Sequence, residues 1–345
     1  MKLNRLLLAQ MRAATRSLWR TGPAAPGAAV QQAMKNAAAM QRVAQRQMRD
    51  FTAPPAAAPV QPVRERHAGN FVDGFHVNAA GRRDYKLYVP GSYNGAPAPL
   101  LVMLHGCTQD PDDFANGTQM NALAEEFGCL VLYPAQSKGA NPSRCWNWFN
   151  AVDQRRDEGE PSIIAGMTQA IMASHAVDPA QVYVAGLSAG GAMATIMGTL
   201  YPELYAAVGV HSGLPFASAN DLSSALAAMK GDFRRSHEGG GQALPIIVFH
   251  GDRDTTVHPA NGDELVAQGA RHLIQPGMAE PGRVPDGHAY TRTLYPDQDG
   301  TVQAEHWLVH GAGHAWFGGD ARGSYTDGKG PDASREMMRF FRTRR

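Results

Sequence analysis

The chain has 345 residues, of which 43% are hydrophobic and 18% are charged, and its formal net charge is +1. This composition is typical of a globular protein with a sizeable core, and the near-neutral charge argues against nucleic acid as a partner. The sequence has no apolar run of the roughly 20 residues that a membrane span needs. Its three cysteines are too few for a disulfide scaffold and lack the Cys-x-x-Cys spacing of a zinc site.

The N-terminal part differs from the rest in composition. Residues 1–49 contain basic side chains but no acidic ones, and apolar side chains recur there at helical spacing. Two interpretations of residues 1–50 stay open: a poorly ordered leader, or a basic amphipathic helix that contacts a polymer granule or a membrane. The short apolar stretch is followed at once by arginines, which does not fit a secretory signal. Residues 51–69 are expected to form an extended linker rich in proline and alanine.

From residue 70 to residue 345 the pattern is that of a folded domain. Residues 75–90 resemble two strands around a glycine-containing turn. Further strands are expected at 99–106, 129–134, 181–186, 206–213, 244–254 and 305–314, and helices at 120–128, 161–177, 191–202 and 331–344. This alternation predicts an α/β fold with a mostly parallel central sheet flanked by helices. Residues 214–242 contain no buried strand, and we expect them to pass over the sheet edge that holds the active site.

A Gly-x-Ser-x-Gly turn stands between the strand expected at 181–186 and the helix expected at 191–202. A serine hydroxyl is a weak nucleophile until a base takes its proton. A tight strand-to-helix turn raises that hydroxyl above the sheet edge, and Gly186 and Gly190 leave room for the turn. The context therefore predicts Ser188 as the nucleophile on the elbow of an α/β-hydrolase fold.

In such a fold the acid and the histidine follow the serine in the chain. Two aspartates end the strand at 244–254, and Asp254 is better placed as the acid, because Asp252 fits a turn that bonds to its own backbone. His314 follows a flexible Gly-Ala-Gly and can reach Ser188, whereas His310 continues the last strand and fits a packed strand end. We predict Asp254 and His314 as the partners of Ser188.

An oxyanion hole needs two backbone N–H groups directed at the developing negative charge. Ala189 follows the nucleophile and supplies one of them. The loop after the early strand supplies the other, and there Cys107 follows a His-Gly pair. Metal catalysis is not expected, because the histidines lack a His-Glu-x-x-His spacing.

Five motifs together resemble the polyhydroxybutyrate depolymerase esterase family, whose relatives include feruloyl and acetyl xylan esterases. They are LHGCTQDPDDFANGTQMNALAEEFGCLVLYPAQ, RCWNWFN, GLSAGGAM, HGDRDTTVHPANG and HGAGHAWFGG. The resemblance covers about residues 70–345. It implies an α/β-hydrolase fold, Ser188, Asp254 and His314 as the triad, and the amides of Cys107 and Ala189 as the oxyanion hole. It also implies ester hydrolysis through an acyl-enzyme without a cofactor.

Aromatic residues near these motifs bear on the substrate. We expect Trp316, two residues after His314, and Trp146 to line a groove for an apolar acyl or polyester chain. Trp148, Phe149 and Phe317 are expected to pack in the core.

The cysteines offer one candidate disulfide. Cys145 precedes the aromatic cluster and is a candidate partner for Cys107, although Cys107 as a free structural thiol stays open. Such a bond would not persist in a reducing compartment. Cys129 is expected to be a buried thiol.

The preferred function is hydrolysis of a 3-hydroxyalkanoate polyester or its oligomers by a serine esterase. The alternative is a carboxylesterase of the feruloyl or acetyl xylan type, acting on small esters. A third interpretation is a protein that associates with a granule or membrane surface through residues 1–50, with hydrolysis secondary. The family resemblance favours export, the lack of a recognisable signal peptide favours the cytoplasm, and the sequence leaves the oligomeric state open.

Overall fold

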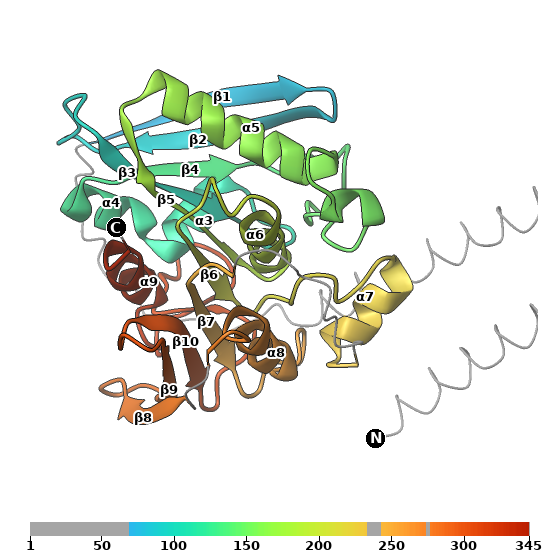
Figure 1. Ribbon diagram of the computed structural model, residues 1–345, viewed down its shortest axis with the longest axis vertical. Helices are drawn as coiled ribbons and strands as arrows, with labels where there is room; N and C mark the ends of the chain where they lie inside the picture. The colour runs from blue at the N-terminus through green and yellow to red at the C-terminus, as the bar shows by residue number, and fades with distance from the viewer. Residues whose placement is uncertain (1–68, 233–242, 274–276, 345) are drawn as a thin grey trace, which may run out of the picture. The chain divides into compact units, whose positions relative to one another are not determined.

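A large mixed sheet forms the centre of the computed structural model, which describes residues 69–232, 243–273 and 277–344 (Figure 1). Its strands lie side by side in the order β1 (Asn70–Asn78), β2 (Gly81–Val89), β4 (Leu130–Pro134), β3 (Ala98–Leu104), β5 (Val177–Leu187), β6 (Ala207–His211), β7 (Ile246–Gly251), β10 (Val302–Val309), β9 (Ala289–Pro296) and β8 (Met278–Arg283). The six strands from β4 to β10 run parallel to one another. The predicted mostly parallel sheet is thus confirmed, and antiparallel strands flank it on both sides.

Helices cover both faces of this sheet. They are α3 (Pro111–Thr118), α4 (Met120–Phe127), α5 (Gly159–Ser174), α6 (Ala189–Leu200), α7 (Leu222–Met229), α8 (Ala260–Gly269) and α9 (Ala333–Arg342), with a short 3-10 helix η1 (Ala151–Gln154). In Figure 1, α5, α6 and α8 lie on one side of the sheet, and α3, α4 and α9 on the other. Two short strands, β11 (Trp316–Phe317) and β12 (Thr326–Asp327), pair in parallel outside the large sheet.

The central strands are apolar throughout because both of their faces are buried. In β3, the side chains of Leu100, Val102 and Leu104 enter the core under α5 and α6. Those of Leu101 and Met103 enter the core on the other side. Successive side chains of a strand point to opposite faces, so a strand covered by helices on both faces needs an unbroken apolar run.

The outer strands β8 and β9 were not predicted, because they are not buried on both faces in this way. All but one residue of β8 are exposed, and it contains Pro281 and Gly282. The described part of the segment 214–242 contains no strand, as expected, and contributes α7, while residues 233–242 lie outside the described part. The segment predicted for residues 1–50 also lies outside it, as does nearly all of the predicted linker.

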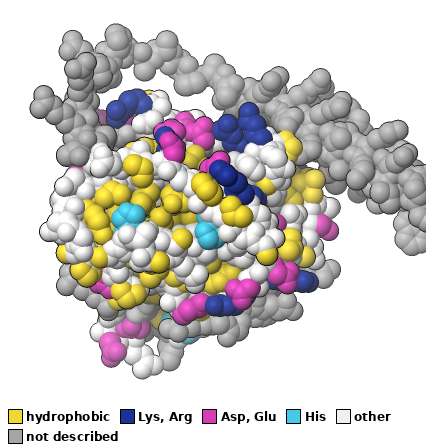
Figure 2. All heavy atoms as spheres, turned by 90° about the horizontal axis from the view of Figure 1, so that it is seen from above, with side chains coloured by type: hydrophobic (Ala, Val, Ile, Leu, Met, Phe, Trp, Pro, Cys, Tyr) yellow, Lys and Arg dark blue, Asp and Glu magenta, His cyan; other side chains and the backbone are white. Residues whose placement is uncertain are grey.

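The outer hairpin of β1 and β2 presents apolar side chains to solvent. Val72, Phe75 and Val77 on β1 are each at least 46% exposed, and the guanidinium of Arg82 lies 4.1 Å from the centre of the Phe75 ring. Figure 2 views the molecule from above and shows hydrophobic side chains gathered around histidine side chains, with charged side chains towards the borders of that face. Within the described residues, no helix combines the length and the hydrophobicity that a bilayer-spanning segment requires.

Candidate active site

Ser188 occupies the junction between β5 and α6. Its backbone has φ 57° and ψ −119°, a conformation that residues other than glycine rarely adopt. Its amide donates a 2.9 Å hydrogen bond to the carbonyl of His211, at the end of the neighbouring strand β6. The strained turn is therefore fixed against the sheet, and strain of this kind is typical of functional sites.

The flanking glycines are required by close backbone contacts. A Cβ atom on Gly186 would lie 2.3 Å from the carbonyl oxygen of Gly190. A Cβ atom on Gly190 would lie 2.0 Å from the carbonyl oxygen of Leu104. The first turn of α6 thus passes directly over the ends of β3 and β5, where only glycine fits.

Asp254 and His314 form a short hydrogen bond after the ends of β7 and β10. His314 Nδ1 donates to Asp254 Oδ2 at 2.6 Å, and Asp254 Oδ1 accepts from the amides of Thr256 and Val257 at 2.9 and 2.8 Å. Burial raises the pKa of Asp254, but the hydrogen bond and charge of His314 outweigh it and leave that pKa below its ordinary value. An ionised Asp254 keeps the proton of the imidazole on Nδ1, so Nε2 carries the lone pair.

The sheet order brings the three residues to one edge. β5, β6, β7 and β10 are consecutive parallel neighbours, so their carboxyl ends meet at the same edge of the sheet. Ser188 follows β5, Asp254 follows β7, and His314 follows β10. The arrangement is the one in which ligands of open α/β sheets are bound beyond the carboxyl ends of strands.

A second Asp–His pair lies beside the first. His310 Nδ1 and Asp252 Oδ2 are 3.0 Å apart, and Asp252 Oδ1 accepts from the amide of Gly311 at 2.7 Å. The expectation that Asp252 bonds to its own turn is therefore wrong, whereas His310 does lie at a strand end, where its Nε2 is also 3.0 Å from Thr291 Oγ1. Both residues come directly after adjacent parallel strands, so they face each other, with 36% and 40% of their side chains exposed.

Two backbone amides near Ser188 are free to bind an oxyanion. Ala189 is the first residue of α6, where an amide has no partner within the helix. The loop that carries Cys107 passes next to Ser188, since a Cβ atom on Gly106 would lie 3.6 Å from Ser188 Cβ. Among the described residues, neither the amide of Cys107 nor that of Ala189 donates to a protein acceptor.

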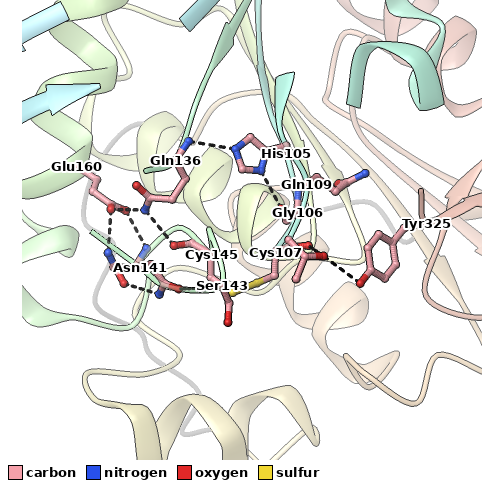
Figure 3. Close-up of a disulfide and its surroundings, with 12 residues drawn as sticks. His105, Gly106, Cys107, Gln109, Gln136, Asn141, Ser143, Cys145, Glu160 and Tyr325 are labelled. Carbon is pink, nitrogen blue, oxygen red and sulfur yellow. Dashed lines mark hydrogen bonds between the residues drawn. A yellow bond between two sulfur atoms is a disulfide. The ribbon is translucent and has the colours of Figure 1, made fainter. Parts of the chain in front are cut away.

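A disulfide and a buried histidine hold this loop. Cys107 is bonded to Cys145, 38 residues further along the chain (Figure 3). His105 Nδ1 lies 2.7 Å from the carbonyl oxygen of Gly106, and His105 Nε2 accepts from the amide of Gln136 at 3.1 Å. Burial lowers the pKa of His105 to about 4, so the ring is neutral, donating through Nδ1 and accepting through Nε2.

A buried polar cluster supports the other end of the disulfide. Gln136 donates through Nε2 to the carbonyl of Cys145 at 2.9 Å and to Glu160 Oε1 at 2.5 Å. Glu160 also accepts from Arg83 and from the amide of Asn147, at 3.0 and 2.7 Å. Burial raises the pKa of Glu160. This cluster could not be predicted from the sequence, because its members come from separate elements and form no motif.

The two tryptophans expected to line the substrate site are inside the protein. Trp146 is 0% exposed and packs against His105, with ring centres 5.6 Å apart. Trp316 is 1% exposed, lies 5.1 Å from the His211 ring, and donates through Nε1 to Ser334 Oγ at 3.0 Å. Neither indole presents a face to solvent, so both support the loops of the site from within the core.

Within ranges 69–232, 243–273 and 277–344, no group of three or more histidine, cysteine, aspartate or glutamate side chains is arranged to hold a metal ion. The polar groups that converge at the sheet edge are instead a serine, an imidazole with its carboxylate, and backbone amides. Chemically, such a set can transfer an acyl group through the serine oxygen.

The known proteins that the chain resembles include depolymerases and esterases. Poly(3-hydroxyalkanoate) depolymerase C of Paucimonas lemoignei is 34% identical over 256 residues, covering 70% of this chain and 60% of that protein. Feruloyl esterase B of Thermothelomyces thermophilus is 28% identical, over 67% of this chain and 87% of its own length. The chain thus spans less than two thirds of the depolymerase that it matches.

A solved structure has the same fold. The acetyl xylan esterase from Aspergillus awamori superposes with a TM-score of 0.63 at 21% identity, covering 79% of this chain and 98% of its own. The fold is therefore that of the α/β hydrolases. Residues 83–275, which include the Ser188 elbow and Asp254, match the family described as esterase PHB depolymerase. Because that match covers more than half of the chain, the protein belongs to the PHB depolymerase esterase family.

Proposed function

We propose that this protein is a serine esterase that hydrolyses 3-hydroxyalkanoate polyester or its oligomers through an acyl-enzyme. The observation that carries the proposal is the 2.6 Å hydrogen bond between His314 and Asp254 at the sheet edge that bears the Ser188 elbow. Membership of the family and the free amides of Cys107 and Ala189 support the same reaction.

In the proposed reaction, His314 Nε2 takes the hydroxyl proton of Ser188 while Ser188 Oγ attacks the carbonyl carbon of the ester. The negative charge on the carbonyl oxygen is bound by the amides of Cys107 and Ala189. The tetrahedral intermediate collapses, the C–O bond to the alcohol breaks, and His314 gives its proton to the leaving alcohol. A water molecule then loses a proton to His314, attacks the acyl group and releases the acid, which restores the Ser188 hydroxyl.

The polyester substrate is proposed from the relative in Paucimonas lemoignei, which is named as a poly(3-hydroxyalkanoate) depolymerase. The similarity to a feruloyl esterase favours a second candidate, a carboxylesterase for aryl or acetyl esters. Both candidates use the same serine, histidine and aspartate, so they differ only in which ester fits beside Ser188.

The test compares the wild type with Ser188→Ala on 4-nitrophenyl butyrate, a hydroxybutyrate trimer, amorphous polyhydroxybutyrate and methyl ferulate. We expect kcat to fall by a factor on the order of 10⁶ in Ser188→Ala. Ser174→Ala, at the end of α5, is the matched control and should keep full activity. A Ser188→Ala variant that keeps the kcat of the wild type would refute the mechanism. Cleavage of methyl ferulate alone by the wild type would refute the polyester substrate but leave the mechanism intact.

A further inference from the structure

Thr108, next to the proposed oxyanion donor Cys107, has a backbone conformation that its surroundings must hold. Its φ is 70°, in the left-handed region that β-branched residues rarely occupy. Its amide donates to the carbonyl of Ser143 at 2.6 Å, on the segment that the disulfide ties to this loop. If Thr108 relaxed to an ordinary conformation, the backbone of Cys107 would turn with it.

Tyr325 contacts this turn from the far end of the chain. Its hydroxyl lies 3.1 Å from Thr108 Oγ1, and Thr108 Oγ1 donates to the carbonyl of Cys107 at 2.6 Å (Figure 3). A threonine hydroxyl has a single proton, which here goes to the carbonyl, so the tyrosine hydroxyl is the donor to Thr108. The hydrogen bonds therefore run in one direction, from Tyr325 through Thr108 to Cys107.

The backbone of Tyr325 is held by the segment that carries the proposed base. Its carbonyl accepts from the amide of Trp316 at 2.7 Å, and Trp316 stands two residues after His314. Tyr325 is 37% exposed and has φ 53°, so neither core packing nor a preferred backbone conformation explains its place. Its hydroxyl links the His314 segment to the Cys107 loop.

A second link joins the same two segments. Gln109 accepts from the amide of Gly106 at 2.9 Å and donates through Nε2 to the carbonyl of Ser324 at 3.1 Å. This link is independent of the tyrosine hydroxyl. The loops should therefore stay folded together when only that hydroxyl is removed.

We propose that Tyr325 is a positioning residue that directs the amide of Cys107 at the developing oxyanion and couples it to the segment carrying His314. The role rests on the proposed esterase function. Tyr325 takes no part in bond making, and acts through Thr108. It should therefore contribute more to binding of the transition state than to binding of the ester.

Tyr325→Phe tests this role, because it removes only the hydroxyl. We expect kcat for 4-nitrophenyl butyrate to fall about tenfold, less than the loss of a direct oxyanion donor, with KM unchanged. The affinity for an alkylboronic acid, which forms a tetrahedral adduct on the serine, should fall by the same factor. Tyr93→Phe is the matched control, since its hydroxyl accepts from Ala176 near the amino end of β5. It should change neither value.

Combining Tyr325→Phe with Thr108→Ala tests the pathway. If Tyr325 acts through Thr108, the double variant should be no slower than Thr108→Ala alone. Additive losses would overturn the proposal, as would an unchanged kcat in Tyr325→Phe. A raised KM that grows from 4-nitrophenyl acetate to the octanoate would instead show that the ring contacts substrate, and would also overturn it. A wild type inactive on every ester would refute the proposed function itself.

Discussion

Asp254 determines which nitrogen of His314 carries the proton. An asparagine in its place keeps the shape of the side chain, and its oxygen can still accept from the backbone amides of Thr256 and Val257. Its NH2 group, however, can donate to His314 Nδ1. His314 would then carry its proton on the wrong nitrogen. We expect Asp254→Asn to fold normally and to lower kcat by about 10⁴-fold.

The matched control is Asp252→Asn. That change alters the neighbouring, more exposed pair with His310, so kcat should stay within a factor of about three, since surface ion pairs contribute little. Steady-state kinetics on 4-nitrophenyl butyrate measure both variants. Equal losses in the two variants would contradict the choice of Asp254 over Asp252.

The serine elbow requires glycine at position 190, because there is no room for a Cβ atom. A Cβ atom there would lie 2.0 Å from the backbone oxygen of Leu104, which cannot move without displacing the end of β3. We expect Gly190→Ala to lower the free energy of unfolding by about 3 kcal/mol or more. Urea denaturation measures it, with Gly139→Ala as the control, because the nearest atom to a Cβ on Gly139 is 3.9 Å away. A fully stable Gly190→Ala would show that the turn can relax.

At the scale of elements, the disulfide joins the loop after β3 to the loop before α5. Closing a loop of 38 residues stabilises the folded state by about 4 kcal/mol in the chain-entropy model. The double variant Cys107→Ser, Cys145→Ser should lose that stability, and it should also lose kcat, because the Cys107 loop is then held by fewer contacts.

The wild type treated with a reductant can be compared with the double variant. Dithiothreitol should lower the melting temperature and kcat of the wild type to those of the double variant, and leave the double variant unchanged. Cys129 cannot take over the bond, because it is buried and its pKa is raised by burial to about 12. A wild type whose kcat is insensitive to reductant, despite loss of the bond, would show that the disulfide does not shape the oxyanion loop.

The elements that could be predicted from the sequence are those whose burial leaves a pattern. The apolar run at 99–106 and the amphipathic pattern at 331–344 correspond to β3 and α9. The exposed strand β8 and the half-buried strand β9 leave no such pattern and were missed. Local motifs also pointed to Asp254 and His314, since each follows a buried strand at the same sheet edge.

Features that depend on contacts between distant segments could not be predicted. The burial of Trp146 and Trp316 depends on which elements cover them, so their proximity to catalytic motifs in sequence was misleading. The link from Tyr325 to Thr108 spans 217 residues and follows no spacing rule. The roles predicted for residues 1–50 fall outside the described residues and stay predictions.

At the scale of the whole molecule, buried neutral histidines make stability depend on pH. Burial lowers the pKa of His105, His250 and His306 to about 4 each, and that of His211 well below its ordinary value. In the unfolded chain these groups titrate near 6.5, so between pH 6.5 and 4 the unfolded state binds more protons than the folded state. Stability should therefore be highest above pH 6.5 and fall as the pH drops towards 4, by about 1.4 kcal/mol per pH unit for each histidine.

Urea denaturation at pH 7.5, 6 and 5 measures this dependence. His306 lies away from the Ser188 edge and is one of the four histidines whose pKa burial lowers, so His306→Gln should make the decline shallower by about a quarter. His175→Gln, on a partly exposed histidine after α5, should leave the slope unchanged. A stability that is flat between pH 7.5 and 5 would contradict the burial of these rings as neutral groups.

The contact between Thr108 and Tyr325 can form only late in synthesis on the ribosome, because the two residues lie 217 positions apart in the chain. A growing chain that has reached residue 300 already contains the disulfide cysteines, the serine elbow and both amides proposed to bind the oxyanion. It still lacks His314 and Tyr325, the proposed positioning residue. Since domains fold as units, and β10 and α9 are also missing at that length, the nascent chain would not yet hold a folded site. Hydrolytic activity would begin only when the last part of the chain is released and docks.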